Sequence, residues 1–236
     1  MVSTANRLDR SLLYGVPAFA GLPGDALDDV LRGATARRYA KGATVFEQGA
    51  AADVFFVLID GRLKVVQVTP AGHQIVVRFV NPGELFGIAA AIGRDDYPAT
   101  ALAATESVAL AWAMADWPRL IERHPAIAGN ALRTVGARLQ ESHTRIREMS
   151  TERIERRIAH ALLRLAQQAG QRTDSGVTIA FPISRQDIAE MTATTLHTVS
   201  RVMSAWEQDG IVEGGRQRVV IRDPHALVQI AEDLER

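Results

Sequence analysis

Cysteine is absent from the 236 residues of the chain. Disulfide bonds, thiolate nucleophiles, cysteine-based zinc sites and iron–sulfur clusters held by cysteine are therefore excluded. No apolar run approaches the roughly 18 residues that a membrane span needs. The N-terminal residues also lack the continuous apolar segment of a secretory signal. We therefore expect a cytoplasmic protein that does not contact a membrane.

The chain also lacks a net charge, because 27 basic side chains balance 27 acidic ones. Net charge alone therefore gives no indication of a nucleic-acid partner. The type of basic residue is more informative, since residues 126–236 contain 15 arginines and no lysine. Arginine suits bidentate contacts to phosphate and guanine better than lysine does. The arrangement of the arginines therefore carries more weight than their number.

Short β-branched runs separated by glycines predict an antiparallel β-domain between about residues 38 and 112. The predicted strands are Val54–Ile59, Leu63–Val68, Ile75–Val80 and Val108–Trp112. Asp60-Gly61 and Pro70-Ala71-Gly72 fit hairpin turns. Turn signals at such short intervals are typical of a small barrel or roll. We assign residues 1–125 to this β-roll domain.

Helical periodicity follows the β-domain. Asp116 is the expected N-cap of a short helix that ends near His124-Pro125, and a longer helix is predicted from about Ala126 to Met149. Its seam residues recur at alternating spacings of three and four: Leu132, Val135, Leu139, Ser142, Ile146 and Met149. This heptad pattern favours pairing with an identical helix, with packing on the β-domain as the alternative. Residues 126–150 are therefore the predicted dimerisation helix.

A second amphipathic helix is predicted after residue 150, where we place a domain boundary. Its inward residues are Ile154, Ile158, Leu162 and Leu165. It should end before Gly170, and Gln171–Gly176 is expected to form a polar loop. Residues 151–236 are the predicted third domain.

The stretch from Ser184 to Arg201 predicts a helix-turn-helix. Ser184 and Asp187 fit a capping box that opens a short helix, and Ala189 is small enough for a second helix to cross closely. Thr195 can cap the second helix, which should end at Gly210. On that helix Leu196, Val199, Val202, Met203 and Trp206 form the predicted buried side. His197, Ser200, Arg201 and Ser204 form a polar stripe on the other side.

A helix with such a stripe, braced by a shorter helix, can enter the major groove of DNA. A generic helical pair with a solvated polar face is the alternative. The following segments, Ile211-Val212, Gly214-Gly215 and Arg218–Ile221, predict a two-stranded wing. Arg216 and Arg218 would be available to phosphates there.

Three glycine-framed segments and one recognition motif carry a resemblance to a known family. They are Lys41-Gly42…Phe46…Gly49, Phe56-Val-Leu-Ile-Asp-Gly61, Pro82-Gly83-Glu84-Leu85-Phe86-Gly87 and Thr198-Val199-Ser200-Arg201. The chain resembles the Crp/Fnr family of transcriptional regulators. The resemblance implies an α+β fold: an antiparallel β-roll of the cyclic-nucleotide-binding jelly-roll type, a long dimerisation helix and a C-terminal winged helix-turn-helix. It also implies a homodimer on a palindromic operator in double-stranded DNA, with RNA polymerase as a partner.

The resemblance assigns roles to individual residues of the helix-turn-helix. Ser184, Arg185 and Gln186 would meet phosphates, and Thr195 and Thr198 would flank the groove. Ser200 and Arg201 would face bases, with Arg201 best suited to guanine. His197 stands where the family commonly has Glu, so base preference should differ there. Ala193 stands where Gly is usual, because the turn favours a positive φ; alanine there should cost about 1 kcal/mol.

The β-roll departs from the family members that bind cyclic AMP. Those members place a Glu directly after the glycine that corresponds to Gly87, and an Arg-Ser pair about ten residues later. This chain has Ile88 and Pro98-Ala99 at those positions, which cannot hold a ribose hydroxyl and a cyclic phosphate in that way. We therefore expect no binding of cyclic AMP. The predicted effector pocket consists of Gly87, Ile88, Tyr97, Pro98 and Ala99.

The segments after Phe86 and around Tyr97 look most like the nitrogen-oxide-responsive (DNR/NnrR-like) branch of the family. That resemblance implies haem as the cofactor, which needs an axial ligand. His73 is the candidate in the roll, and an exposed hairpin histidine is the alternative interpretation. The other candidates are His124 at the edge of the roll and His143 on the dimerisation helix.

Two other classes of protein share parts of this pattern. A cupin-like metal oxygenase needs two or three histidines and a carboxylate on neighbouring strands, and the roll offers only His73. A ligand-binding module that regulates protein partners would lack the helix-turn-helix. We therefore expect a regulator and not an enzyme.

Overall fold

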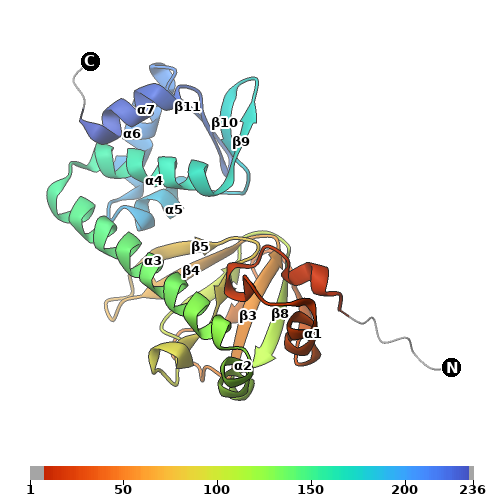
Figure 1. Cartoon of the computed structure of the whole chain (residues 1–236). Coiled ribbons are helices and arrows are strands. Elements are labelled where there is room, and N and C mark those ends of the chain that lie inside the picture. The colour runs from red at the N-terminus through yellow and green to blue at the C-terminus, as the bar shows by residue number, and fades with distance from the viewer. Residues whose placement is uncertain (1–7, 234–236) are drawn as a thin grey trace. The chain divides into compact units, whose positions relative to one another are not determined.

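The computed structural model describes residues 8–233, apart from the side chains of residues 90 and 91 (Figure 1). The described residues divide into two compact units. The first lies within Met1–Val65 and Phe79–Gln140, and the second within Val66–Arg78 and Glu141–Arg236. Helices combine with antiparallel sheets, which confirms the α+β class. Among the described helices, none has both the length and the hydropathy to cross a membrane.

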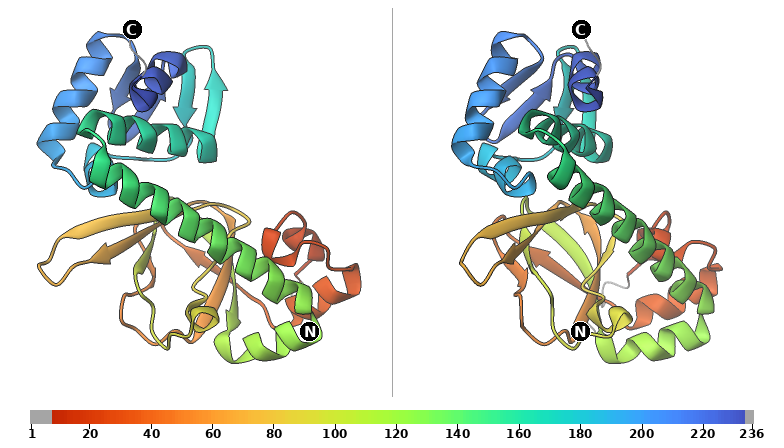
Figure 2. Two further views of the ribbon diagram at one scale, coloured as in Figure 1. Left: turned by 60° about the vertical axis from the view of Figure 1, so that its left-hand side comes forward. Right: turned by 90° about the vertical axis from the view of Figure 1, so that its left-hand side faces the viewer.

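Two four-stranded sheets form the β-roll, in the orders β1-β8-β3-β6 and β2-β7-β4-β5 (Figure 2). Their strands are β1 (Thr35–Tyr39), β2 (Thr44–Phe46), β3 (Val54–Asp60), β4 (Leu63–Val68), β5 (Gln74–Val80), β6 (Leu85–Phe86), β7 (Thr100–Ala103) and β8 (Ser107–Ala113). The four predicted strands are confirmed as β3, β4, β5 and β8. The other four lack a marked apolar pattern, because they are short or, in the case of β1, exposed along most of their length.

Strand β3 is buried on both faces, which explains its continuous apolar sequence. Phe55 and Val57 face a cluster that includes Trp112, Leu120 and Ile127, here called the first core cluster. Phe56 and Leu58 face the interior of the roll. Successive side chains of a strand point to opposite faces, so this single strand joins the two halves of the core.

Several short helices and the long helix α3 accompany these strands. They are the 3-10 helices Arg10–Leu13, Pro17–Phe19, Ala89–Ile92 and Met114–Asp116, and the α-helices α1 (Gly24–Arg32), α2 (Trp117–Arg123) and α3 (Pro125–Thr151). Asp116 is the N-cap residue of α2, as predicted, but its side chain does not form the cap. Asp116 already has helical backbone angles (φ −81°, ψ −17°) because the preceding 3-10 turn runs directly into α2. Its side chain therefore makes no capping hydrogen bond.

A buried carboxylate ties α1 to the end of α2. Asp29 accepts hydrogen bonds from Arg123 at 3.0 Å and from Arg32, and lies 2.9 Å from His124 Nε2. Burial disfavours the ionised carboxylate, but the hydrogen bonds to His124 and Arg32 and the charge of Arg123 outweigh that penalty. They hold the pKa of Asp29 at about 2. The cluster therefore stabilises the fold only while Asp29 is ionised.

The second unit contains four helices after the long helix α3 and a four-stranded sheet in the order β11-β12-β10-β9. Its elements after α3 are α4 (Ile154–Ala169), β9 (Gly170–Thr173), β10 (Gly176–Ile179), α5 (Arg185–Met191), α6 (Leu196–Gln208), β11 (Val212–Gly215), β12 (Arg218–Ile221) and α7 (Pro224–Glu232). The predicted polar loop Gln171–Gly176 is wrong, because this segment belongs to the hairpin β9–β10. Its pairing with β12 is long-range, at Val177↔Ile221 and Thr178↔Val220, and local sequence carries little sign of it.

The buried ion pair of Asp29 generates a prediction about acid stability. The pKa is 3.8 for the ordinary carboxyl and about 2 in the folded chain. The stabilisation is therefore fully present above about pH 4 and is lost as the pH falls toward 2, with a total of about 2 kcal/mol. Asp29→Asn should remove this dependence. The difference in free energy of unfolding between wild type and variant should then shrink by about that amount, as measured by urea unfolding at a series of pH values.

Asp28→Asn is the matched control, because Asp28 is about half exposed and pairs only with Arg10 among the described residues. Its difference from wild type should stay nearly constant with pH. A constant difference for Asp29→Asn as well would contradict the prediction.

Candidate nucleic-acid interface and effector pocket

Helix α5 begins at a complete capping box, as predicted. The Ser184 hydroxyl accepts a hydrogen bond from Asp187 N at 3.1 Å, and the Asp187 carboxylate accepts one from Ser184 N at 2.9 Å. The same hydroxyl also donates to the Asp187 carboxylate at 2.6 Å. Ser184 is therefore occupied in starting the helix, which positions α5 for the turn that follows.

The turn between α5 and α6 depends on one strained residue. Ala193 has a φ of 50°, a left-handed conformation that favours glycine. Thr192, which is buried, donates its hydroxyl to Ile188 O at 2.7 Å, and Thr194 N donates to Ala189 O at 3.1 Å. These bonds hold the tight turn despite the alanine, so the predicted positive φ at this position is confirmed.

Helix α6 has the two faces that the sequence predicts, with one exception. Val199, Val202, Met203 and Trp206 are buried, but Leu196 is 47% exposed, so its predicted burial is wrong. Leu196 is the first residue of α6 and lies just outside the core that the later turns contact. Thr195 caps the helix by accepting from Thr198 N at 3.2 Å.

The polar stripe of α6 faces outward. His197 and Arg201 are exposed, and Ser200 and Ser204 are half-buried. Among the described residues neither His197 nor Arg201 makes a side-chain hydrogen bond or ion pair. By contrast, the hydroxyls of Thr195 and Thr198 lie 2.9 Å apart and bond to each other.

The two phosphate candidates on α5 are both engaged within the chain. Gln186 is exposed and donates to Glu190 at 2.9 Å. Arg185 donates to Glu207 at 2.7 Å. The predicted contact residues therefore differ in how far they are available to an external partner.

The hairpin β11–β12 forms the predicted wing. Arg216 is exposed in its turn, next to Gln217, which has a φ of 58°. Glu213 accepts from Arg222 at 2.9 Å and lies 3.7 Å from Arg218. The hydrogen bond from Arg222 lowers the pKa of Glu213. Arg218 therefore shares its charge with a carboxylate, whereas Arg216 makes no ion pair within the described chain.

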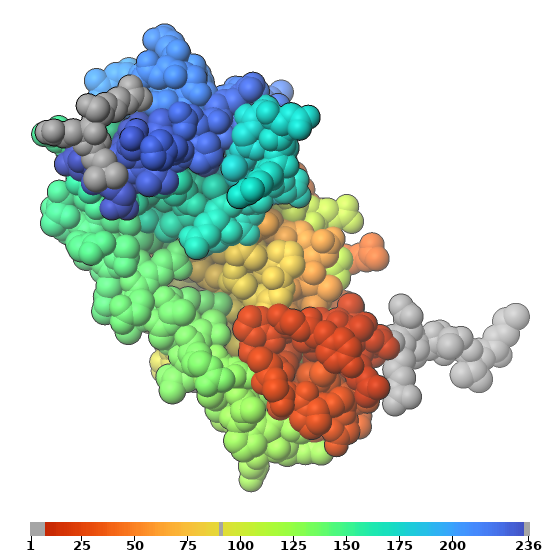
Figure 3. All heavy atoms as spheres, turned by 45° about the horizontal axis from the view of Figure 1, so that its top comes forward, coloured from red at the N-terminus to blue at the C-terminus, as the bar shows by residue number. Residues whose placement is uncertain are grey.

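Most residues of the predicted seam of α3 are exposed to solvent in the single chain. Leu132, Leu139, Ile146 and Met149 are 73%, 52%, 57% and 42% exposed. Ser142 is exposed as well, and Val135 is partly buried against the first core cluster. Figure 3 shows the atoms of α3, in green, uncovered along one side.

Helix α3 is anchored through other residues. Asn130 donates to Ala18 O and Ala20 O, each at 3.0 Å, and Ile127 is fully buried. Apart from Val135, the seam residues are therefore not those by which α3 packs on the core of the first unit.

Aromatic rings fill the part of the roll around Tyr97. The rings of Phe46 and Tyr97 stack with centroids 3.9 Å apart, and Phe46 also stacks on Phe56 and Phe86. The Tyr97 hydroxyl donates to Val54 O at 2.6 Å, and burial raises the pKa of Tyr97. This interior is therefore apolar and closely stacked.

The structure brings together only some residues of the predicted effector pocket. Gly87 lies at the aromatic stack, because a Cβ there would come within 3.0 Å of the Phe56 ring and 3.4 Å of Phe46. Ile88 instead belongs to the first core cluster, on the helix side of the sheet. Pro98 is exposed and Ala99 is buried. Sequence reasoning missed Phe46, which its place in the glycine frame could have indicated.

The candidate haem ligands do not converge on the roll interior. His73 is exposed at the β4–β5 hairpin, as in the alternative interpretation. His124 is held by Asp29, and His143 is exposed on α3. Among the described residues no three histidine, aspartate or glutamate side chains group as a metal site. These residues do not fit a haem site in the roll.

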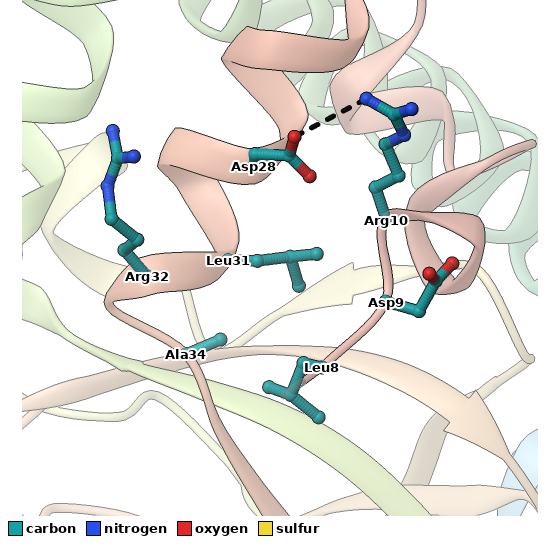
Figure 4. A pocket seen from close by; sticks show the side chains of 7 residues that line it. All are labelled: Leu8, Asp9, Arg10, Asp28, Leu31, Arg32 and Ala34. Atoms are coloured by element: carbon teal, nitrogen blue, oxygen red, sulfur yellow. Dashed lines mark hydrogen bonds and ion pairs between the residues drawn. The ribbon is translucent and has the colours of Figure 1, made fainter. Parts of the chain in front are cut away.

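A hollow of about 550 Å³ lies beside α1 and is not the predicted effector pocket. Figure 4 shows Arg10 and Asp28 pointing toward each other there, 3.3 Å apart, with Arg32 on the opposite side. Its lining residues are Leu8, Asp9, Arg10, Asp28, Leu31, Arg32 and Ala34. Because its arginines already pair with carboxylates, the hollow indicates no particular ligand.

Comparison with known proteins decides the family. Residues 156–230 match the Crp-like helix-turn-helix domain, and residues 36–124 match the cyclic nucleotide-binding domain. The cyclic AMP receptor protein of Thermus thermophilus is 30% identical over 219 residues, which cover 93% of this chain and 98% of that protein. The chain belongs to the Crp/Fnr family of transcriptional regulators.

Other Crp/Fnr proteins align over similar lengths. The transcriptional activator protein FnrA of Stutzerimonas stutzeri is 27% identical and covers 88% of this chain and 84% of its own. A solved Crp-family regulator of Thermus thermophilus is 28% identical, with a TM-score of 0.71 and coverage of 83% and 96%. As a Crp/Fnr protein, the chain is a DNA-binding transcriptional regulator and not an enzyme, and the alternative of a metal oxygenase is set aside.

The strained turn of this Crp/Fnr protein generates a stability prediction. Ala193→Gly should raise the free energy of unfolding of the second unit by about 0.5–1 kcal/mol, because glycine tolerates a positive φ. Ala205→Gly, at an exposed position in the regular part of α6, should lower it by about 1 kcal/mol. Urea unfolding followed by circular dichroism measures both. Equal destabilisation by the two glycines would show that the turn is not strained.

Proposed function

We propose that the chain acts as a homodimer that reads an inverted repeat in duplex DNA through α6. The observation that carries this proposal is the outward stripe of His197, Ser200 and Arg201 on a helix whose opposite face is buried apart from its first residue, Leu196. The positive end of the α6 dipole lies at the same end as His197. Two such helices, related by a two-fold axis, would fit successive major grooves about 34 Å apart. RNA polymerase is included as a partner on the family resemblance alone.

The solvent-exposed seam of α3 supports the proposed homodimer. Large apolar side chains that are half exposed or more, repeated at heptad spacing, are typical of a helix that pairs with another. Pairing with the same face of an identical helix gives a two-fold axis and so matches an inverted repeat. The proposed interface is Leu132, Val135, Leu139, Ser142, Ile146 and Met149.

We further propose that the roll responds to an effector other than cyclic AMP. The Thermus relative is named for cyclic AMP, but Ile88 is buried on the helix side of the sheet and Pro98 is exposed. Neither side chain can make the contacts to an anionic nucleotide that a carboxylate or a guanidinium makes. The stacked rings around Phe46 favour an apolar or aromatic effector. The positions of the histidines give no support to control by nitric oxide through haem.

Selection of binding sites from random duplex DNA tests the proposed function. The purified wild-type protein should enrich an inverted repeat with half-sites about one helical turn apart. Adding cyclic AMP should change neither the enriched sequence nor the affinity. No enrichment, or enrichment of a single half-site, would contradict the dimeric reading of DNA.

His197→Glu should change the preferred base at one position in each half-site. A carboxylate accepts a hydrogen bond from cytosine N4, whereas imidazole donates to guanine or to a phosphate. The same selection, run with the variant, measures the change. Gln208→Ala, at the exposed end of α6, is the control and should leave the enriched sequence as it is. An identical sequence for His197→Glu would remove His197 from base recognition.

Leu139→Glu should separate the dimer. The substitution would bury two carboxylates against each other at the centre of the seam, so the dimer dissociation constant should rise roughly a hundredfold or more. Light scattering at several protein concentrations measures the mass. Gln140→Glu adds the same charge one position off the seam and should leave the dimer intact. A stable Leu139→Glu dimer would place the interface elsewhere.

A further inference from the structure

One ion pair connects three elements of the helix-turn-helix unit. Arg185 is the first residue of α5, and its guanidinium donates to Glu207 of α6 at 2.7 Å. The two side chains are 34% and 29% exposed, so both are largely covered. The backbone of Gly214, in β11 of the wing, lies directly against the pair.

Each of these charges is unfavourably placed on its own helix. A cation at the start of α5 opposes the positive end of the helix dipole, and a carboxylate in the last turn of α6 opposes the negative end. Pairing Arg185 with Glu207 offsets both repulsions at once. The start of α5 is thereby held against the end of α6, where the chain turns into the wing.

Gly214 shows how closely the wing approaches this pair. A Cβ at Gly214 would lie 2.2 Å from Glu207 Oε1 and 3.4 Å from the nearer guanidinium nitrogen of Arg185. Its backbone is not in the left-handed region, so a side chain at this position would not strain the backbone but would displace the Glu207 carboxylate. Gly214 pairs with Val219 across the wing. The ion pair therefore lies against the paired part of the hairpin and not against its turn.

We propose that Arg185 and Glu207 form a brace that fixes the wing relative to α6, and that Arg185 is a positioning residue and not a phosphate ligand. The proposal rests on the proposed function, because it concerns the spacing between two parts of one DNA-binding surface. Arg201 on α6 and Arg216 in the wing turn are the exposed cations whose separation the brace would set. This positioning role would replace the phosphate contact that the family resemblance implies for Arg185.

Amide hydrogen exchange of the free protein tests the brace without DNA. In Arg185→Gln and in Glu207→Gln, the amides of residues 212–221 should exchange about two- to fivefold faster, as expected for loss of a partly exposed ion pair. The double variant should exchange no faster than either single variant, since both remove the same interaction. The charge-reversed pair Arg185→Glu with Glu207→Arg should recover part of the protection. Unchanged exchange of the wing in both single variants overturns the proposal.

The salt dependence of DNA binding separates a brace from a phosphate contact. A side chain that neutralises a phosphate lowers the slope of log K against log salt by about 0.9 when it is removed. Arg185→Gln should keep the wild-type slope while the ratio of specific to non-specific affinity falls about two- to fivefold. Arg216→Gln is the positive control: because each subunit of the dimer contributes one Arg216, it should reduce the slope by about 1.8.

Glu207→Gln gives the decisive direction of change. If Glu207 braces the wing, its loss weakens specific binding as much as Arg185→Gln does. If Glu207 merely withholds Arg185 from a phosphate, its loss strengthens binding, and that result overturns the proposal. The proposed function and the brace can fail separately. Failure of the wild-type protein to select any DNA sequence contradicts the proposed function. The hydrogen exchange of the wing amides tests the brace without DNA.

Discussion

A buried carboxylate at the end of α3 connects this long helix to α4, the first helix that follows it. Glu148 is 4% exposed, and both of its carboxylate oxygens accept hydrogen bonds from Arg164 Nη1 of α4, at 2.6 and 2.8 Å. A buried ion pair adds little net stability, but removing one partner leaves the other charge uncompensated, at a cost of several kcal/mol. The pair therefore restricts the angle between α3 and α4. Met149, the last residue of the proposed seam, is the next residue along α3.

This ion pair would connect a change in the pairing of α3 to the position of the DNA-binding helix α6. Helix α4 buries Ile158, Leu162 and Leu165 in the second unit, so it moves with that unit's core. A change in how two α3 helices pair would act on α4 through Glu148 and Arg164, and so on α6. An effector can drive such a change only if it binds one arrangement more tightly than the other. Near the predicted domain boundary at residue 150, the ion pair of Glu148 and Arg164 would therefore have to rearrange or rotate as a unit.

Sequence periodicity predicted those elements whose stabilising contacts are local. The capping box at Ser184 and the heptad seam of α3 follow from residues a few positions apart, whereas the positive φ of Ala193 followed from the family resemblance. The hairpin β9–β10 was missed because its stability comes from pairing with β12, some 40 residues later in the chain. The family resemblance assigned Arg185 to phosphates, and local sequence did not reveal its ion pair with Glu207. Its partner Glu207 is 22 residues away and no local pattern connects them.

The formal charge of zero is compatible with binding DNA because the carboxylates near the proposed interface are already paired. Glu207 holds Arg185, Glu213 holds Arg222, and Asp187 is part of a helix cap. A paired carboxylate and arginine present little net field to a distant phosphate, since their charges cancel over a short distance. The exposed Arg201 and Arg216, together with the start of α6, then determine the local field. Their positions, and not the total number of arginines, are what a DNA backbone would meet.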